Sequence, residues 1–137
     1  MGHTCSAIIV HCIDFRLGPA ISDWLKSEKL MGDCDIVGIA GAAKNFNGEK
    51  DEDVLMTQIE ISSKLHEIKK VILMNHTDCG AYGGRAAFEN REVEDTTHSD
   101  ALSHGADVLK EKLPHLEVQK MIAQIEPDGT IHIESII

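Results

Sequence analysis

Three short aliphatic runs lie within the first 75 residues, separated by segments in which apolar residues recur at helical spacing. The runs cover residues 7–13, 34–40 and 70–75. Continuous apolar runs of this length are typical of strands that are buried on both faces of a sheet. Strands that alternate with helices predict a mostly parallel sheet with helices packed on both of its faces.

The segments between and after these runs predict the helices. One helix is expected to open at Gly18-Pro19, because proline is favoured in a first turn, and to stop at Gly32. Three more are predicted at about 50–68, at 81–89 and at 102–113. The polar, acidic residues 90–98 lack apolar periodicity and predict a loop.

Two further strands are expected near the end of the chain, at 119–125 and 130–136, around the turn signal Pro127-Asp128-Gly129. The complete order predicts an α/β fold in three layers (α/β/α), with a central, mainly parallel sheet and a C-terminal hairpin strand. The length of 137 residues and the absence of a linker or internal repeat predict a single domain over residues 1–137.

The charge balance is acidic, since 13 Lys and Arg stand against 23 Asp and Glu and give a net charge of −10. Phosphate contacts need clustered cations, so nucleic acid and anionic membranes are unexpected partners. No apolar run approaches the roughly 20 residues of a membrane span, and no secretory signal pattern is present. We therefore expect a cytoplasmic protein with reduced thiols, in which Cys5 and Cys34 lie in the core or at the surface.

The end of the first predicted strand carries an unusual set of side chains, in the motif Cys12-x-Asp14-x-Arg16. Alternate residues of an extended chain point to one side, so the thiol, the carboxylate and the guanidinium are expected to share a face. Asp and Arg are almost never buried unless they are paired. By itself this motif favours a surface ion pair beside a core cysteine.

The third predicted strand ends in a second motif, His76-x-x-Cys79. Imidazole and thiolate are both good zinc ligands, and a helix that begins after Cys79 would lower the pKa of its thiol. Parallel strands end at the same edge of a sheet, so Cys12 is expected to join His76 and Cys79 if the two strands are neighbours. Three protein ligands with a fourth position open are typical of catalytic zinc.

Together, Cys-x-Asp-x-Arg after the first strand and His-x-x-Cys after the third resemble the β-class carbonic anhydrases. The resemblance implies a zinc ion held by Cys12, His76 and Cys79, with an Asp14–Arg16 dyad beside it. It also implies a zinc lyase that reversibly hydrates carbon dioxide to bicarbonate through a zinc-bound hydroxide. Such enzymes are usually homodimers or larger assemblies.

The loop after the second predicted strand departs from the family. It reads Gly38-Ile39-Ala40-Gly41, where the family usually has Arg-Asn-Ala-Gly. This difference leaves two alternatives open: a zinc-dependent relative that acts on another small substrate such as carbonyl sulfide, and a zinc protein without catalysis. A nucleotide-binding domain is a weaker reading, because the loop does not fit the phosphate-binding pattern Gly-x4-Gly-Lys-Ser/Thr.

A homodimer is the assembly that the resemblance implies. Only six residues precede the first predicted strand, too few for the family's N-terminal helical arm, so we expect a dimer that is built differently. The terminal hairpin is expected to supply apolar surface for it. The residues concerned are Ile131, Ile133, Ile136 and Ile137.

Overall fold

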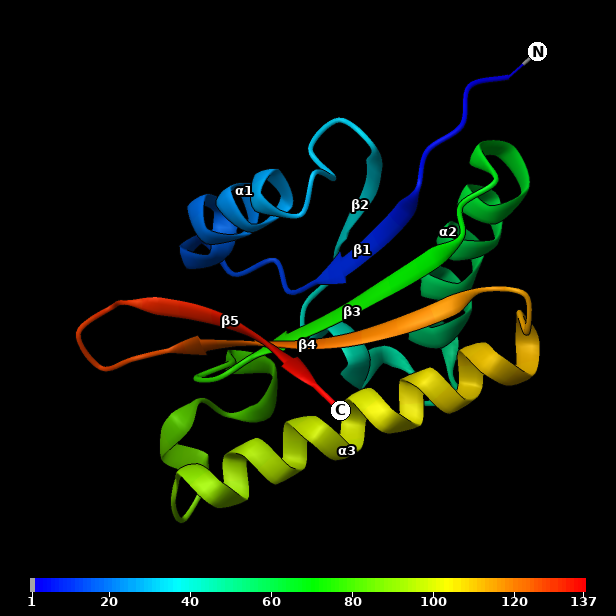
Figure 1. Cartoon of the computed structure of the whole chain (residues 1–137). Coiled ribbons are helices and arrows are strands. Elements are labelled where there is room, and N and C mark those ends of the chain that lie inside the picture. Colours follow the sequence, from blue (N-terminus) through cyan, green and yellow to red (C-terminus); the bar gives the residue numbers. More distant parts are fainter. Residues whose placement is uncertain (1) are drawn as a thin grey trace.

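A five-stranded sheet runs through the computed structural model, which describes residues 2–137 (Figure 1). Its strands are β1 (Ala7–His11), β2 (Cys34–Gly38), β3 (Lys70–His76), β4 (Glu117–Ile125) and β5 (Ile131–Ile136). Their spatial order is β2-β1-β3-β4-β5, with the first four parallel and β5 antiparallel to β4. The predicted α/β fold, with a mainly parallel sheet and a C-terminal hairpin, is confirmed.

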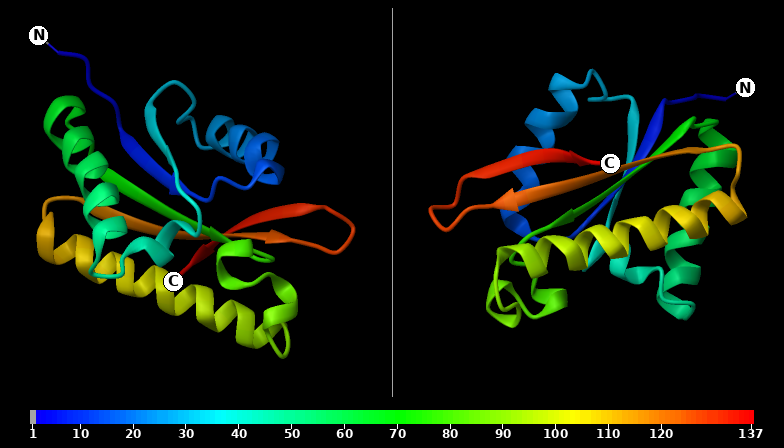
Figure 2. Two further views of the ribbon diagram at one scale, coloured as in Figure 1. Left: turned by 180° about the vertical axis from the view of Figure 1, so that it is seen from behind. Right: turned by 60° about the horizontal axis from the view of Figure 1, so that its bottom comes forward.

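Three α-helices cover the two faces of the sheet. They are α1 (Gly18–Ser27), α2 (Lys50–His66) and α3 (Arg91–Lys112). Helix α1 lies on one face, and α2 and α3 lie on the other (Figure 2). Within residues 2–137, no helix is both long enough and apolar enough to cross a membrane.

The alternation of side chains along the strands divides the core in two. On β1, Ile8 and Val10 pack with residues of α2 and α3, whereas Ala7 and Ile9 pack with residues of α1. These four side chains are at most 1% exposed. A strand covered on both faces cannot show polar alternation, so the sequence reads as a continuous apolar run.

The segment between β3 and β4 differs from the prediction. The helix expected at 81–89 is replaced by two short 3₁₀ turns, Gly80–Tyr82 and Arg85–Ala87. Gly83 and Gly84 separate these turns, and their positive φ values of 92° and 78° interrupt any continuous helix.

The loop expected at 90–98 is also wrong, because α3 begins at Arg91. The Asn90 side chain caps this helix by accepting a hydrogen bond from the Val93 N–H at 2.9 Å. The inner face of the first turns carries Glu94 and His98, which are only 2% and 0% exposed. Apolar periodicity could not predict this part of the helix, since the buried face is polar.

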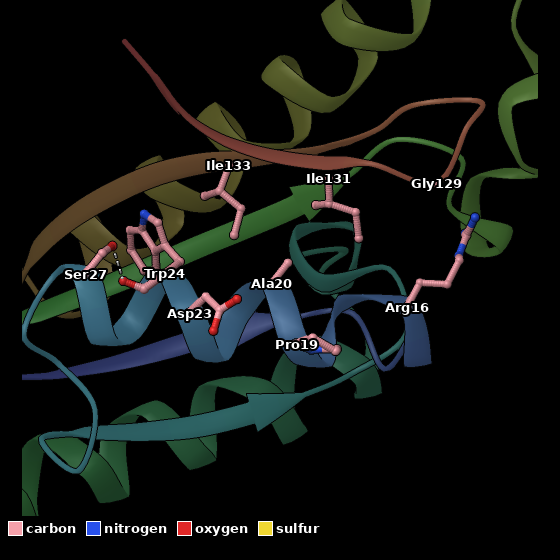
Figure 3. A pocket seen from close by; sticks show the side chains of 9 residues that line it. All are labelled: Arg16, Pro19, Ala20, Asp23, Trp24, Ser27, Gly129, Ile131 and Ile133. Atoms are coloured by element: carbon pink, nitrogen blue, oxygen red, sulfur yellow. Dashed lines mark hydrogen bonds between the residues drawn. The ribbon is translucent and has the colours of Figure 1, made fainter.

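The terminal hairpin packs against its own chain more closely than predicted. Ile131 and Ile133 reach from β5 toward Ala20 and Trp24 of α1, across an open groove of about 650 Å³ (Figure 3). Ile131 and Ile133 are half-buried in this way, Ile136 is half-buried against the core on the opposite face of the sheet, and Ile137 alone of the four is exposed. The hairpin therefore offers little of the apolar surface that was expected for a partner.

We predict that the carboxylate of Glu52 stabilises the fold. It accepts hydrogen bonds from the Gly48 N–H (3.0 Å) and from Lys112 Nζ (2.9 Å), which join the start of α2 to the end of α3. The Lys112 ammonium and the Gly48 N–H lower the pKa of Glu52. Glu52→Gln should reduce the free energy of unfolding at pH 7 by about 1–3 kcal/mol in urea titrations.

The sign of the pH dependence follows from the lowered pKa of Glu52. A depressed carboxylate pKa adds stability above the unfolded value of about 4.3, and this stability is lost as the pH falls through the folded value. The gap between wild type and Glu52→Gln should therefore close below about pH 4. The exposed Glu60 of the same helix provides the matched control, Glu60→Gln. Two results would contradict the prediction: an equal loss of unfolding free energy in the two variants, or a difference between wild type and Glu52→Gln that persists in acid.

Candidate metal centre

The structure brings Cys12, His76 and Cys79 together at the carboxyl edge of the sheet. Cys12 follows β1, His76 is the last residue of β3, and these two strands are neighbours. The Sγ atoms of Cys12 and Cys79 lie 3.9 Å apart, and one ligand atom from each of the three residues lies within 4.8 Å of the others. All three side chains are buried. This arrangement is a pocket of two sulfur donors and one nitrogen donor.

The imidazole of His76 is held in the form that ligates a metal. Its Nδ1 lies 2.7 Å from the carbonyl oxygen of Thr77, and since a carbonyl only accepts, Nδ1 must carry the proton and donate it. In the neutral imidazole Nε2 then carries a lone pair, and Nε2 is buried without a hydrogen-bond partner among the described residues. A buried polar atom without a partner is costly. A cation with a preference for sulfur and imidazole, such as Zn²⁺, would satisfy it.

The two thiols have different electrostatic environments. The Cys79 thiol holds the pKa of Cys12 well below its ordinary value. The Gly41 N–H, which lies 3.5 Å from the Cys12 sulfur, also lowers it. The neighbouring Cys12 thiolate and burial raise the pKa of Cys79. The expected lowering by a helix N-terminus is wrong, because only a three-residue 3₁₀ turn follows Cys79. The pair nevertheless offers one thiolate to an incoming cation.

The loop that differs from the family still shapes the site. Gly41 has a φ of 82°, and a Cβ there would lie 3.1 Å from Cβ of Ala81 and 3.2 Å from Cβ of Lys44. Asn45 holds the loop from the other side by donating to the carbonyl oxygens of Ala40 (2.8 Å) and Ala42 (2.9 Å). Glycine at this position therefore lets the backbone N–H approach the Cys12 sulfur.

Asp14 and Arg16 form a close ion pair at the mouth of the site. The Asp14 carboxylate accepts hydrogen bonds from the Arg16 backbone N–H (2.9 Å), Nε (3.0 Å) and Nη2 (2.7 Å). The two side chains meet through a 3₁₀ turn, Phe15–Leu17, rather than along the extended strand that was expected. Hydrogen bonds from Arg16 lower the pKa of Asp14 to about 2. The ionised carboxylate lies with Oδ2 3.8 Å from Nε2 of His76.

Asp78 anchors this ion pair, and the sequence analysis missed its role. Asp78 adopts a φ of 54°, and its Oδ2 and carbonyl oxygen accept hydrogen bonds from Arg16 at 3.1 and 3.0 Å. Its other carboxylate oxygen accepts from the Arg85 N–H (2.8 Å), and its own N–H donates to Glu94 (2.7 Å). Its position directly before Cys79 in the motif was the available signal. Arg16 is thus fixed between two carboxylates.

A second buried network was also missed, on the far side of β3. The Asn75 amide N–H₂ donates to Tyr82 Oη and to His98 Nδ1, both at 3.0 Å, and its oxygen accepts from the Ala43 N–H. Burial lowers the pKa of His98 to about 4 and raises the pKa of Tyr82 to about 12. Both groups are therefore neutral near pH 7, and the network fixes the residue beside His76.

We predict that Gly41→Ala weakens zinc binding. The new Cβ forces the loop away from the Cys12 sulfur, and loss of such an outer contact typically costs about 10–100-fold in metal affinity. Gly48→Ala is the matched control, since Gly48 also has a positive φ (73°) but has no atom within 4 Å of the added Cβ. Competition titrations with a chromophoric chelator measure the affinity. Equal zinc affinities in the two variants would show that the Gly41 contact is irrelevant to binding.

Comparison with known proteins identifies the family of this chain. The family model described as "Putative carbonic anhydrase" matches residues 2–131. An uncharacterized protein of Rickettsia bellii (strain RML369-C) is 33% identical over 132 residues, which cover 92% of this chain and 79% of that protein. An uncharacterized protein of Rickettsia conorii (strain ATCC VR-613 / Malish 7) is 30% identical, with 92% and 70% covered.

A solved structure shares the fold. The crystal structure of β-carbonic anhydrase isoform I from Trichomonas vaginalis superposes with a TM-score of 0.65 at 14% identity, over 99% of this chain and 84% of that chain. The likeness extends to the whole layered sheet, and the match of the family model confirms the resemblance seen in the sequence motifs. The chain belongs to the putative carbonic anhydrase family.

Proposed function

We propose that this protein is a zinc-dependent carbonic anhydrase, which interconverts carbon dioxide and bicarbonate. One observation carries the proposal: Nε2 of His76, buried and without a partner, lies 3.8 Å from the ionised carboxylate of Asp14. His76 Nε2, which could bind a metal, and the Asp14 carboxylate, which can accept a hydrogen bond, therefore lie beside the same space. Family membership and the shared fold support this activity.

Cys12, His76 and Cys79 would hold the zinc ion. When bound, zinc supplies Lewis acidity that makes water a nucleophile near neutral pH. Two thiolates and a neutral imidazole would balance the charge of the ion, and three protein ligands would leave one coordination position for chemistry.

Asp14 would orient the nucleophile. An ionised carboxylate only accepts hydrogen bonds, so a hydroxide beside Oδ2 has to point its proton at Asp14 and keeps a lone pair for the carbon of carbon dioxide. Bond formation between that oxygen and the carbon gives bicarbonate. Three hydrogen bonds from Arg16 hold the carboxylate in place, and the contacts of Arg16 with Asp78 hold Arg16. The same contacts oppose movement of Asp14 onto the metal.

The activity prediction separates the role of Asp14 from that of the ligands. Asp14→Asn should retain zinc and lose roughly a hundredfold or more in kcat/KM for hydration, because the amide offers a donor where an acceptor is needed. Cys12→Ser should lose activity and the zinc ion that Cys12 would share with His76 and Cys79. The partly exposed Asp23 of α1 provides the control Asp23→Asn, which should keep both. Stopped-flow hydration and metal analysis on one preparation make the measurement.

One outcome would move the proposal to its alternatives, and two others would contradict part or all of it. Tightly bound zinc without hydration of carbon dioxide at any pH would favour a relative that hydrolyses another small substrate, such as carbonyl sulfide, or a zinc protein without catalysis. An Asp14→Asn variant with wild-type turnover would contradict the role given to the carboxylate. Absence of zinc from the wild-type protein purified in zinc-containing medium would overturn the whole proposal.

We further propose that the protein is a homodimer through the β2 edge of the sheet. Within residues 2–137, β2 pairs on one side only. Ile36 of β2 is 59% exposed and lines a hollow with Met31 (45% exposed), and the 66% exposed Ile13 lies beside Gly38 at the end of β2. Large exposed apolar side chains that adjoin an unpaired strand edge are typical of interaction surfaces.

The dimer prediction is tested by light scattering. Wild type should have twice the 15.0 kDa mass of one chain, and Ile36→Lys should shift it toward the monomer, since a buried unpaired charge opposes association. Val54→Lys is the matched control, because Val54 is equally exposed (57%) but lies on α2. A monomeric wild type, or a dimer unaffected by Ile36→Lys, would contradict this interface.

A further inference from the structure

A second cluster of metal-ligating side chains lies at the amino-terminal ends of β1 and β2, opposite the carboxyl ends that carry the first site. Cys5 precedes β1, Asp35 lies near the start of β2, and His66 is the last residue of α2. Each offers one ligand atom, and these three atoms all lie within 4.8 Å of one another. Cys5 and Cys12 are seven positions apart in nearly extended chain, which places this cluster about 20 Å from the first.

The backbone holds these three elements together. The Cys5 N–H donates to the His66 carbonyl oxygen at 3.0 Å, and the Ser6 N–H donates to the Asp33 carbonyl oxygen at 3.1 Å. Figure 1 shows the chain before β1 lying beside the end of α2. The cluster therefore lies on a hydrogen-bonded framework rather than on a free end of the chain.

The side chains already converge on a common point. His66 Nδ1 lies 2.6 Å from Asp35 Oδ2, and Ser62 Oγ donates to the same oxygen at 2.6 Å. Burial raises the pKa of the Cys5 thiol, and the charge of the nearby Asp35 carboxylate raises it further. A simple ion pair explains Asp35 and His66, but it does not explain the half-buried Cys5 thiol, which donates to the Ala7 carbonyl oxygen at 3.6 Å and lies within 4.8 Å of the same carboxylate.

A cation has room and a further donor here. The three residues line a cavity of about 330 Å³ together with His3 and Cys34. The ring of His3 lies 4.8 Å from the ring of His66, centroid to centroid. Thiolate, imidazole and carboxylate together suit borderline divalent cations of the zinc type rather than Mg²⁺ or Ca²⁺.

We propose that Cys5, Asp35 and His66 form a second binding site for a zinc-type divalent cation, with His3 as a fourth ligand. The cation displaces the thiol proton of Cys5 and the proton between His66 Nδ1 and Asp35 Oδ2, both of which are released to solvent. It then ties the segment before β1 to β2 and to the end of α2. Because the site exists only in the folded chain, the bound cation stabilises the fold.

Metal counting on the full-length, reduced protein tests the proposal. The probe is Co²⁺ alone, added in excess and followed by its charge-transfer absorption with thiolate sulfur. Wild type should bind two equivalents, and Cys5→Ser should bind one and lose about a third of the charge-transfer intensity, since two of three thiolate bonds remain. Cys12→Ser should keep the equivalent bound at Cys5. Cys34→Ser, a second thiol of the same cavity, is the matched control and should keep both equivalents.

His3→Ala guards against variants that fail to fold, since His3 is exposed. It should weaken the second equivalent about tenfold and leave the first unchanged. A single equivalent in wild type, or a second equivalent unaffected by Cys5→Ser, would overturn the proposal. This experiment counts bound metal and does not measure hydration of carbon dioxide. Failure of the carbonic anhydrase assignment can therefore be distinguished from failure of the second site.

Discussion

The parallel pairing of β1 with β3 is the contact on which the candidate site depends. Each strand ends in a motif that is incomplete alone. Cys12 follows β1, whereas His76 ends β3 and Cys79 lies just beyond it. The register that pairs Val10 with Leu73 carries both strands to the same edge. Both strands are buried on both faces, and a slip of one residue in their pairing would move every side chain to the opposite face of the sheet. The hydrophobic core thereby fixes the position of Cys12 relative to His76.

Charged groups extend from this edge in a continuous series. Asp14 is held by Arg16, Arg16 by Asp78, and the Asp78 N–H by Glu94 of α3. The inner face of α3 is polar where it meets this series and apolar farther along, where Leu102 and Leu109 enter the core. One helix therefore supports both the fold and the candidate site, which explains why Glu94 and His98 are buried.

The sequence was sufficient to predict the layered sheet and the convergence of Cys12, His76 and Cys79, because both follow from strand periodicity and from the common edge of parallel strands. It was insufficient for the start of α3. There the buried residues are Glu94 and His98, which form hydrogen bonds, so apolar residues do not recur at helical spacing. The cluster at Cys5, Asp35 and His66 was equally hidden. Its members come from three elements, carry no motif, and meet only through the tertiary fold.

The central claim is that a single zinc ion binds to two sulfurs and one imidazole at the carboxyl edge. X-ray absorption at the zinc edge, on Cys5→Ser protein loaded with one equivalent, tests it most directly. Binding by Cys12, His76 and Cys79 predicts two sulfur neighbours at about 2.3 Å and two nitrogen or oxygen neighbours near 2.0–2.1 Å. A shell of nitrogen and oxygen alone, or one with a single sulfur, would contradict it.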